Sequence, residues 1–157
     1  MSKIKVHFVA LGIVGGLILM AAQPLLVQAG EKGHHHVQYM QAMEPKGTTS
    51  VGKEPFPGNT LPAGGGYKIK PPNKKGKWQV STYIWNPNQV IVRKGDRVTL
   101  KIVGLNGAKH SGSIEYYHPK EFTVKRGLIT TLNFTADKAG RFKIGCTEHE
   151  PSMTGEL

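Results

Sequence analysis

Three side chains with metal-binding chemistry lie close together near the C-terminal end of the sequence. Cys146 is the only cysteine, His149 follows it by three positions, and Met153 follows His149 by four. A thiolate, an imidazole and a thioether are the soft and borderline ligands that copper prefers. With one more histidine they make the His2Cys set with a weak axial methionine that is typical of mononuclear electron-transfer copper sites. His110 is the candidate for that additional histidine.

Each of these residues also has an ordinary structural explanation. A single cysteine is often a small buried apolar side chain, and a single methionine often fills a gap in a core. The joint spacing favours the metal site, because one short loop can bring the three donors around a single ion. His118 is the runner-up for the additional histidine, but it lies in a predicted surface turn that is typical of a solvated side chain. We prefer His110, because a strand that starts directly after it would hold the imidazole rigidly.

The first 29 residues have the pattern of an export signal. Residues 1–5 carry two lysines, an apolar run of 15 residues covers 8–22, and small residues at 27–29 fit a cleavage site before Gly30. The apolar run is shorter than the roughly 20 residues that span a bilayer. We therefore expect residues 1–29 to be a cleaved signal peptide and the chain to reach the periplasm. An uncleaved segment would instead anchor the chain in the membrane.

Export changes how the cysteine and the charge are interpreted. An exported chain with one cysteine forms no internal disulfide, and ligation to a metal protects the thiol. The formal net charge is +11, and removal of the two lysines of the signal leaves +9. A basic surface attracts nucleic acid, anionic lipid or an acidic protein. Export and the lack of aromatic residues interleaved with lysines argue against nucleic acid. We expect an acidic redox protein as partner, or a membrane surface.

Residues 30–76 have the composition of a flexible extension. They contain nine glycines and six prolines in 47 positions and few large apolar residues. Such a segment buries too little apolar surface to offset its ordering entropy. Within it, residues 63–66 are expected to be a flexible linker. The fold would therefore begin at Lys77.

One feature of this extension has metal-binding chemistry. Three histidines at 34–36 are followed by Met40 and Met43. Such a tract can bind copper loosely, although composition is its only support. We interpret it as part of an exposed tail, in which a short helix over 37–43 is an alternative.

From Lys77 onward the sequence predicts short strands separated by turns. Val98, Leu100 and Ile102 alternate with polar residues, which is the signature of a half-buried strand. Ile144 and Cys146 fall on one face of a later strand with Phe142, so the thiol would lie on its buried side. Other strand-like segments are 78–85, 89–92, 111–115, 121–124, 128–135 and 154–157. Seven or eight such strands predict an all-β fold, an antiparallel Greek-key β-sandwich over 77–157.

The region from Gln79 to Leu157, roughly half of the chain, resembles the cupredoxins, a family of copper proteins. The similar motifs are residues 86–96, residues 110–112, residues 134–140 and the loop that follows Cys146. The resemblance implies an eight-stranded β-sandwich that holds the metal at one end.

The same resemblance implies a set of copper ligands. His110 occupies the position of the family's first histidine, Cys146 and His149 match the thiolate and the second histidine, and Met153 matches the axial methionine of the plastocyanin-like members. Residues 134–146 are particularly similar to nitrosocyanins, the red copper proteins of this family. Nitrosocyanins have a glutamate at the position of His110 and a histidine near that of Met153. The chain therefore departs from them at two ligands, both toward the blue-copper set.

We expect a type 1 (blue) copper protein that carries single electrons between periplasmic redox partners, and not an enzyme. One copper ion per chain would alternate between Cu(I) and Cu(II), and the resemblance implies that His149 is the ligand nearest to solvent. A copper carrier or chaperone that uses the histidine tract is one alternative. A nitrosocyanin-like open-site copper protein is another, for which Glu148 and Glu150 are the nearest acids, and we interpret both as solvated.

Overall fold

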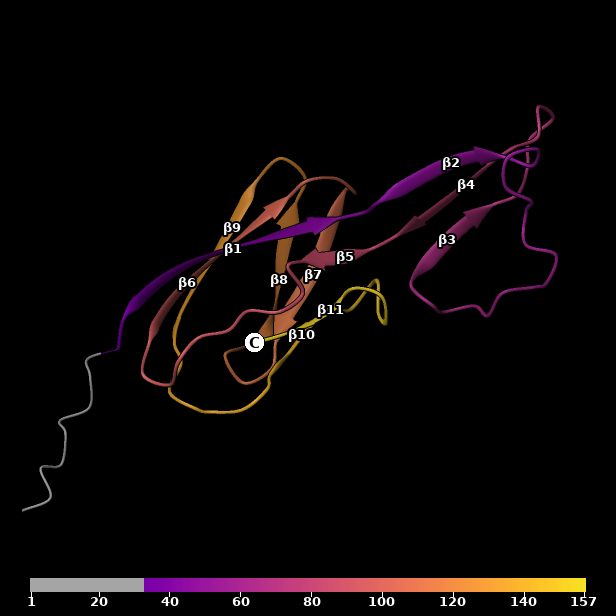
Figure 1. Cartoon of the computed structure of the whole chain (residues 1–157). Helices are drawn as coiled ribbons and strands as arrows, with labels where there is room; N and C mark the ends of the chain where they lie inside the picture. The colour runs from indigo at the N-terminus through magenta and orange to yellow at the C-terminus, as the bar shows by residue number, and fades with distance from the viewer. Residues whose placement is uncertain (1–32) are drawn as a thin grey trace, which may run out of the picture. The chain divides into compact units, whose positions relative to one another are not determined.

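The computed structural model describes residues 33–157, and these form an all-β unit without any helix (Figure 1). The predicted signal peptide, 1–29, lies outside the described residues. The strands are β1 (His35–Met43), β2 (Lys46–Ser50), β3 (Tyr67–Lys70), β4 (Lys77–Thr82), β5 (Ile84–Asn86), β6 (Arg97–Gly104), β7 (Lys109–Ile114), β8 (His118–Lys125), β9 (Ile129–Thr135), β10 (Lys143–Cys146) and β11 (Thr154–Glu156). Residues 33–157 contain no helix that is long and apolar enough to cross a membrane.

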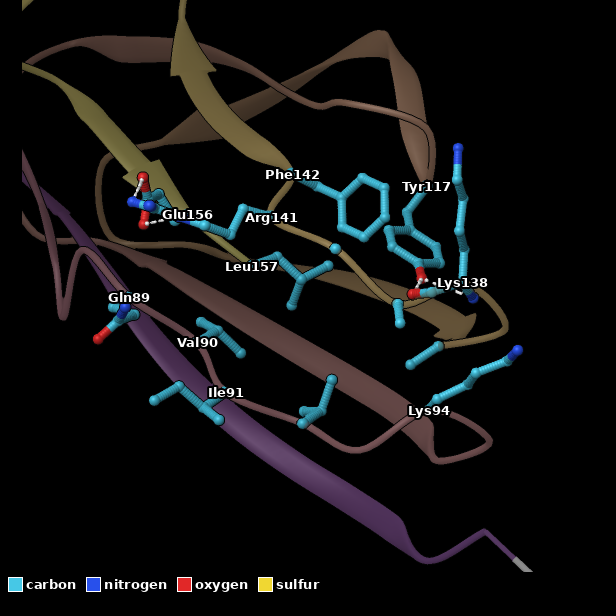
Figure 2. A pocket seen from close by; sticks show the side chains of 14 residues that line it. Gln89, Val90, Ile91, Lys94, Tyr117, Lys138, Arg141, Phe142, Glu156 and Leu157 are labelled. Atoms are coloured by element: carbon cyan, nitrogen blue, oxygen red, sulfur yellow. Dashed lines mark hydrogen bonds and ion pairs between the residues drawn. The ribbon is translucent and has the colours of Figure 1, made fainter.

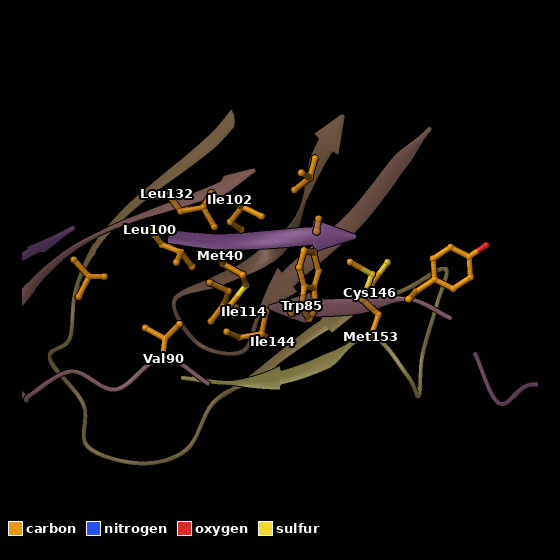
Figure 3. Close-up of a cluster of buried hydrophobic side chains, with 14 of the residues drawn as sticks. Met40, Trp85, Val90, Leu100, Ile102, Ile114, Leu132, Ile144, Cys146 and Met153 are labelled. Atoms are coloured by element: carbon orange, nitrogen blue, oxygen red, sulfur yellow. The ribbon is translucent and has the colours of Figure 1, made fainter. Parts of the chain in front are cut away.

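Two four-stranded sheets enclose the hydrophobic core (Figure 3). Their strand orders are β5-β1-β6-β9 and β11-β10-β7-β8. Both sheets contribute to one buried cluster, which includes Met40, Trp85, Leu100, Ile102, Leu132, Ile114, Val124, Ile144, Cys146 and Met153. The arrangement is consistent with a β-sandwich, and the predicted all-β class is confirmed.

The period-two patterns read from the sequence hold in the strands that carry them. Val98, Leu100 and Ile102 of β6 are at most 1% exposed, while the residues between them are exposed or half-buried. Ile144 and Cys146 of β10 are fully buried. The thiol therefore lies at the C-terminal end of β10 on the side that faces the core.

The prediction that residues 30–76 form a flexible extension is wrong for the segment that forms β1. This strand lies inside the first sheet, parallel to β6 and antiparallel to β5. Its inward residues Met40 and Ala42 are fully buried. The pattern was hidden because His36 and Gln38 also lie on the inward side while Val37 and Tyr39 face out. Neither a tail nor a helix over 37–43 fits this pairing.

The rest of the expected extension also forms regular structure, so the fold does not begin at Lys77. β2 and β3 pair with opposite edges of β4 to make a third sheet of order β2-β4-β3. The expected linker at 63–66 is anchored, because the Ser152 hydroxyl donates a 2.7 Å hydrogen bond to the Gly66 carbonyl. Gly66 has φ +70°, and a Cβ on it would collide with Ser152.

Two further expected strands differ in detail. Residues 78–85 do not form one strand, because the chain passes from the third sheet (β4) to the first (β5) at Tyr83. Residues 89–92 form no strand. Gln89 makes only an isolated bridge to Glu156, and the Val90 amide donates to the Glu156 carbonyl.

Candidate metal centre

Three of the four predicted ligands meet where β7 and β10 lie side by side. One ligand atom from each of His110, Cys146 and His149 lies within 4.8 Å of the others, and this is the one such group of three within residues 33–157. Cys146 Sγ is 3.3 Å from His149 Nδ1, and the two imidazole ring centroids are 5.3 Å apart. His110 and Cys146 are buried, whereas His149 is half-buried. The cluster therefore offers one sulfur and two nitrogen donors to a single ion.

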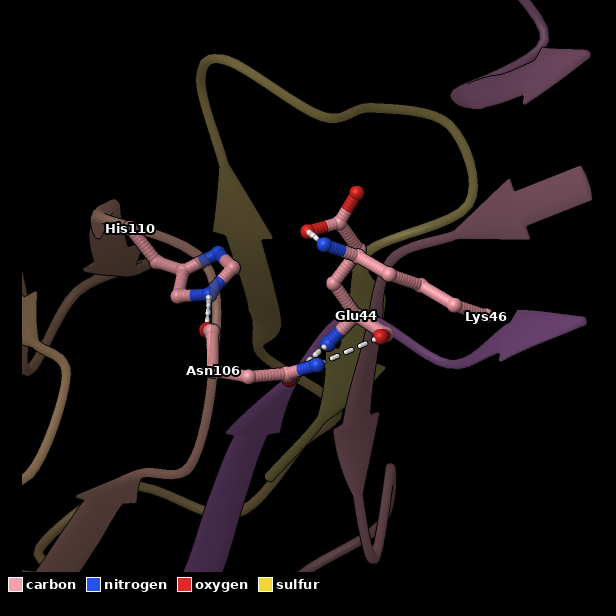
Figure 4. A network of polar contacts seen from close by, with 4 residues as sticks. All are labelled: Glu44, Lys46, Asn106 and His110. Atoms are coloured by element: carbon pink, nitrogen blue, oxygen red, sulfur yellow. Dashed lines mark hydrogen bonds and ion pairs between the residues drawn. The ribbon is translucent and has the colours of Figure 1, made fainter. Parts of the chain in front are cut away.

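His110 is oriented by the loop that precedes β7. Its Nε2 atom lies 3.0 Å from the carbonyl oxygen of Asn106, so Nε2 is the ring nitrogen that donates there (Figure 4). Gly107 has φ +80°, and a Cβ on it would lie 2.9 Å from that nitrogen. Asn106 is fixed in turn by Glu44, whose amide donates to its side-chain oxygen (2.6 Å) and whose carbonyl accepts from its side-chain nitrogen (2.7 Å).

The other ring nitrogen of His110 supplies the test of whether a metal fits. Nδ1 is buried and has no hydrogen-bond partner among the described residues. Leaving a buried polar atom unpaired costs free energy, and coordination to a metal ion would satisfy it. A second-shell bond that fixes one imidazole nitrogen and leaves the other for the metal is the usual arrangement of metal-binding histidines. The residues present therefore fit a metal ion.

The loop between β10 and β11 closes tightly on its own backbone. The Cys146 amide donates to the Met153 carbonyl (3.1 Å), and the His149 amide donates to the Cys146 carbonyl (3.1 Å). The Met153 amide donates to the His149 carbonyl (3.0 Å). Met153 is fully buried in the same apolar cluster as Cys146. The fourth predicted ligand thus belongs to the loop that carries the thiol and the imidazole.

Tyr83 contributes to the site although nothing in the sequence singled it out. Its ring stacks on His149 with centroids 3.6 Å apart and planes 13° apart, and it is 4% exposed. Trp85, two residues on, lies beside His110 at a centroid distance of 6.4 Å. Both rings are buried where the chain crosses from the third sheet to the first, and this crossing leaves no pattern in the sequence that could have identified them. These rings shield the imidazoles from water.

Burial sets the protonation of the metal-free site. It raises the pKa of the Cys146 thiol, against hydrogen bonds from the backbone of Glu148, Ser111 and His149 that act to lower it. Burial also lowers the pKa of His149, and the neighbouring His110 adds to this. Cys146 is therefore a thiol beside a neutral His149 imidazole. Because the thiolate is the ligand form, metal binding would release a proton.

His118 does not join the cluster. It starts β8 and pairs with Ile114, at the far end of β7 from His110. Ile114 is four positions from His110 along β7, which is roughly 13 Å at about 3.3 Å per residue. The His118 ring lies edge-on to Phe134 at 6.0 Å.

The histidine tract is occupied by structural contacts. His36 Nε2 lies 2.9 Å from a carboxylate oxygen of the buried Asp96, and His35 Nε2 lies 2.9 Å from the Thr99 hydroxyl. Met40 is buried in the core. In this arrangement the tract does not present a set of converging metal ligands.

The two acids near the loop are held by lysines. Glu148 lies 3.0 Å from the Lys109 ammonium, whose hydrogen bond is the main cause that lowers the pKa of Glu148. Glu150 lies 2.7 Å from the Lys143 ammonium. Both carboxylates are on the exposed side of the loop, in line with the expectation that they are solvated.

A cavity of about 230 Å³ opens at the other end of β10, away from the cluster (Figure 2). Its wall includes Val90, Phe142 and Leu157, with an ion pair between Arg141 and Glu156 at its edge. None of the clustered ligands lines it. The cavity is therefore not part of the candidate metal centre.

Comparisons with known proteins do not assign a function to this centre. Protein-family models give no match to the chain, and neither do the curated proteins. The candidate function is therefore argued from the site alone.

Proposed function

We propose that the chain is a mononuclear type 1 copper protein with a cupredoxin-like Greek-key fold, which carries single electrons between periplasmic redox partners. The observation that carries the proposal is the buried cluster of His110, Cys146 and His149 with an unpartnered His110 Nδ1. One thiolate and two imidazoles, with a thioether as weak fourth ligand, are the donor set of such sites. Copper bound there would supply a one-electron Cu(I)/Cu(II) couple.

The surroundings of the site suit electron transfer better than turnover of a substrate. Met153, at the end of the loop, is fully buried, and the two acids of that loop are paired with Lys109 and Lys143. Neither acid of the loop is therefore left unpaired to act as a proton donor or acceptor. His149 is the least buried of the three clustered ligands, so it offers the shortest route for an electron to the surface. The carrier alternative loses its main support, since the histidine tract is built into β1.

Voltammetry of the copper-loaded protein tests this proposal. We expect one reversible one-electron wave that azide does not change. Met153→Gln should lower the reduction potential while keeping the colour, because a harder oxygen donor favours Cu(II). A potential that Met153→Gln leaves unchanged, together with a wave that azide shifts, would mean that Met153 is not a ligand and would favour the open-site alternative.

A further inference from the structure

The third sheet, β2-β4-β3, has two chemically different faces. Lys46 of β2 and Lys68 of β3 both pair with Ser81, and directly paired residues of antiparallel strands point to the same side. Residues two positions apart in a strand share that side as well. One face therefore presents Lys46, Thr48, Ser50, Lys68, Lys70, Lys77, Gln79 and Ser81. We call this set the lysine face, and it contains no apolar side chain.

The opposite face of the same sheet is apolar and partly covered. Trp78 is 6% exposed, and Phe56 from the loop between β2 and β3 packs edge-on against it at 5.5 Å. The Trp78 indole nitrogen donates a 2.9 Å hydrogen bond to the Glu54 carbonyl of the same loop. Tyr67 and Ile69 of β3 lie on this side and are half-buried. The lysine face is the more open side of the sheet, because its four lysines are exposed. Ser81 on this face is 8% exposed, and Val80 on the apolar side is 37% exposed.

Positive charge is concentrated on this sheet. Residues 44–77 contain seven lysines and two glutamates, a net charge of +5, whereas residues 78–157 carry eleven lysines and arginines against seven acids, a net charge of +4. Of the seven lysines only Lys46 forms an ion pair, with Glu44 at 3.0 Å. Near the metal loop, by contrast, Lys109 and Lys143 are both neutralised by glutamates. Net positive charge is thus densest in the segment that builds the third sheet and its loops, with Lys46, Lys68, Lys70 and Lys77 on the lysine face.

The lysine face leads to the metal centre. Ser81 and Tyr83 are two positions apart, and the Tyr83 ring stacks on His149. The Lys68 ammonium lies 5.3 Å from the centroid of the same ring. A molecule bound over the lysine face would therefore lie next to Tyr83 and the most accessible ligand.

We propose that the lysine face docks an acidic patch of the redox protein with which this chain exchanges electrons. This inference rests on the proposed function, to which it adds the surface and the chemistry of the partner. Complementary charge would speed the encounter and orient the partner toward His149. This docking surface belongs to the third sheet, whereas His149 lies in the loop between β10 and β11.

An acidic protein fits this face better than a membrane or a nucleic acid. Segments that bind membrane surfaces combine basic residues with apolar side chains that enter the lipid. Single-stranded nucleic acid needs aromatic side chains on which bases stack. The lysine face has threonine, serine and glutamine between its lysines, and the aromatic residues of the sheet lie on the opposite side. Polar residues between charges are typical of a protein interface rim.

The test is a titration of the full chain with a short poly-glutamate peptide at low ionic strength, followed by NMR amide shifts. A triple variant, Lys68→Gln, Lys70→Gln and Lys77→Gln, removes three lysines of the face, none of which forms an ion pair in residues 33–157. A control, Lys94→Gln, Lys120→Gln and Lys125→Gln, removes the same charge from exposed positions outside the third sheet, in the turn before β6 and on β8. We expect the face variant to weaken binding about tenfold and the control less than about twofold. Far-UV circular dichroism checks that both variants fold.

Equal weakening in both variants would overturn the proposal, because it would show attraction by net charge alone. It would also be overturned if the face variant lost binding to vesicles of phosphatidylglycerol and phosphatidylcholine while its affinity for poly-glutamate stayed unchanged. The titration uses neither copper nor electron transfer, so it is separate from the proposed function. If the face binds the peptide but the Cu(II)-loaded chain is not reduced by an excess of ascorbate, a stronger one-electron donor, the acidic docking site stands and its redox role is removed.

Discussion

The His110 ring is oriented by the main-chain carbonyl of Asn106. The side chain of Asn106 is in turn held by Glu44, which is 62 positions earlier in the sequence. The chain of contacts runs from His110 to Asn106 and then to Glu44 at the end of β1. Glu44 is itself tied to Lys46 at the start of β2. The orientation of the imidazole thus depends on the first two strands of the fold.

Asn106→Ala should therefore weaken copper binding without removing any ligand. The backbone carbonyl that accepts from His110 would remain, but the two hydrogen bonds to Glu44 would be lost. Loss of such an outer-shell contact typically costs about 10- to 100-fold in metal affinity. Competition with a chelator measures the effect, and Asn133→Ala, an exposed asparagine on β9, is the control. An unchanged affinity for Asn106→Ala would show that the loop is held by other contacts.

The protonation of Cys146 predicts how copper affinity depends on pH. Burial raises the pKa of the thiol, so at neutral pH the proton must leave before the sulfur can bind. Because the pKa of His149 is lowered from the ordinary value of about 6.5, its imidazole stays neutral at pH values somewhat below 6.5. Apparent affinity should therefore rise with pH, by about tenfold per unit for one released proton. Chelator competition between pH 6 and pH 8, with proton release followed by an indicator dye, measures this slope, and a flat profile would exclude thiol ligation.

At the scale of elements, β1 makes the first sheet continuous. It lies between β5 and β6, and its register with β6 extends from His35 to Ala42. Asp96, which is 2% exposed, accepts from the His34 amide at the beginning of this strand (2.9 Å). The strand is therefore an inner element of the sheet.

Met40→Ala should destabilise the fold by about 2–5 kcal/mol, as is typical when a buried methionine is truncated. Tyr39→Ala, on the neighbouring position of the same strand, should cost less than about 1 kcal/mol. Tyr39 is 56% exposed, and the Lys101 ammonium lies 5.5 Å from the centroid of its ring. Urea unfolding followed by tryptophan fluorescence compares the two. Equal costs would indicate that β1 is not part of the core.

The elements that could be predicted from the sequence are those whose pattern is formed by residues close together along the chain. The ligand loop was recognisable because three donors fall within eight residues, and β6 and β10 because their buried residues alternate. β1 was missed because its partner β6 follows about 60 residues later and its inward face begins with His36 and Gln38. Tyr83 was missed because its role comes from a crossing between sheets, which leaves no pattern in neighbouring residues. The third sheet was hidden by the glycines and prolines of its loops.

At the scale of the whole molecule, the predicted processing leaves the described fold intact. Cleavage before Gly30 would remove residues 1–29, and the first strand begins at His35. No strand of residues 33–157 would be lost. Intact-mass analysis of the protein from its native envelope should give a chain that begins at Gly30. A mass that retains Met1 or Ser2 would show an uncleaved segment and favour a membrane anchor.

The central claim is that Cys146, His110 and His149 bind one copper ion together. The most direct measurement is the visible and EPR spectrum of the copper-loaded chain, with three variants alongside. We predict intense thiolate-to-copper charge transfer that Cys146→Ser abolishes, a site that His110→Ala opens to azide, and no effect of His118→Ala. A copper-loaded wild-type chain without that absorption, or one whose spectrum Cys146→Ser leaves unchanged, would contradict the account.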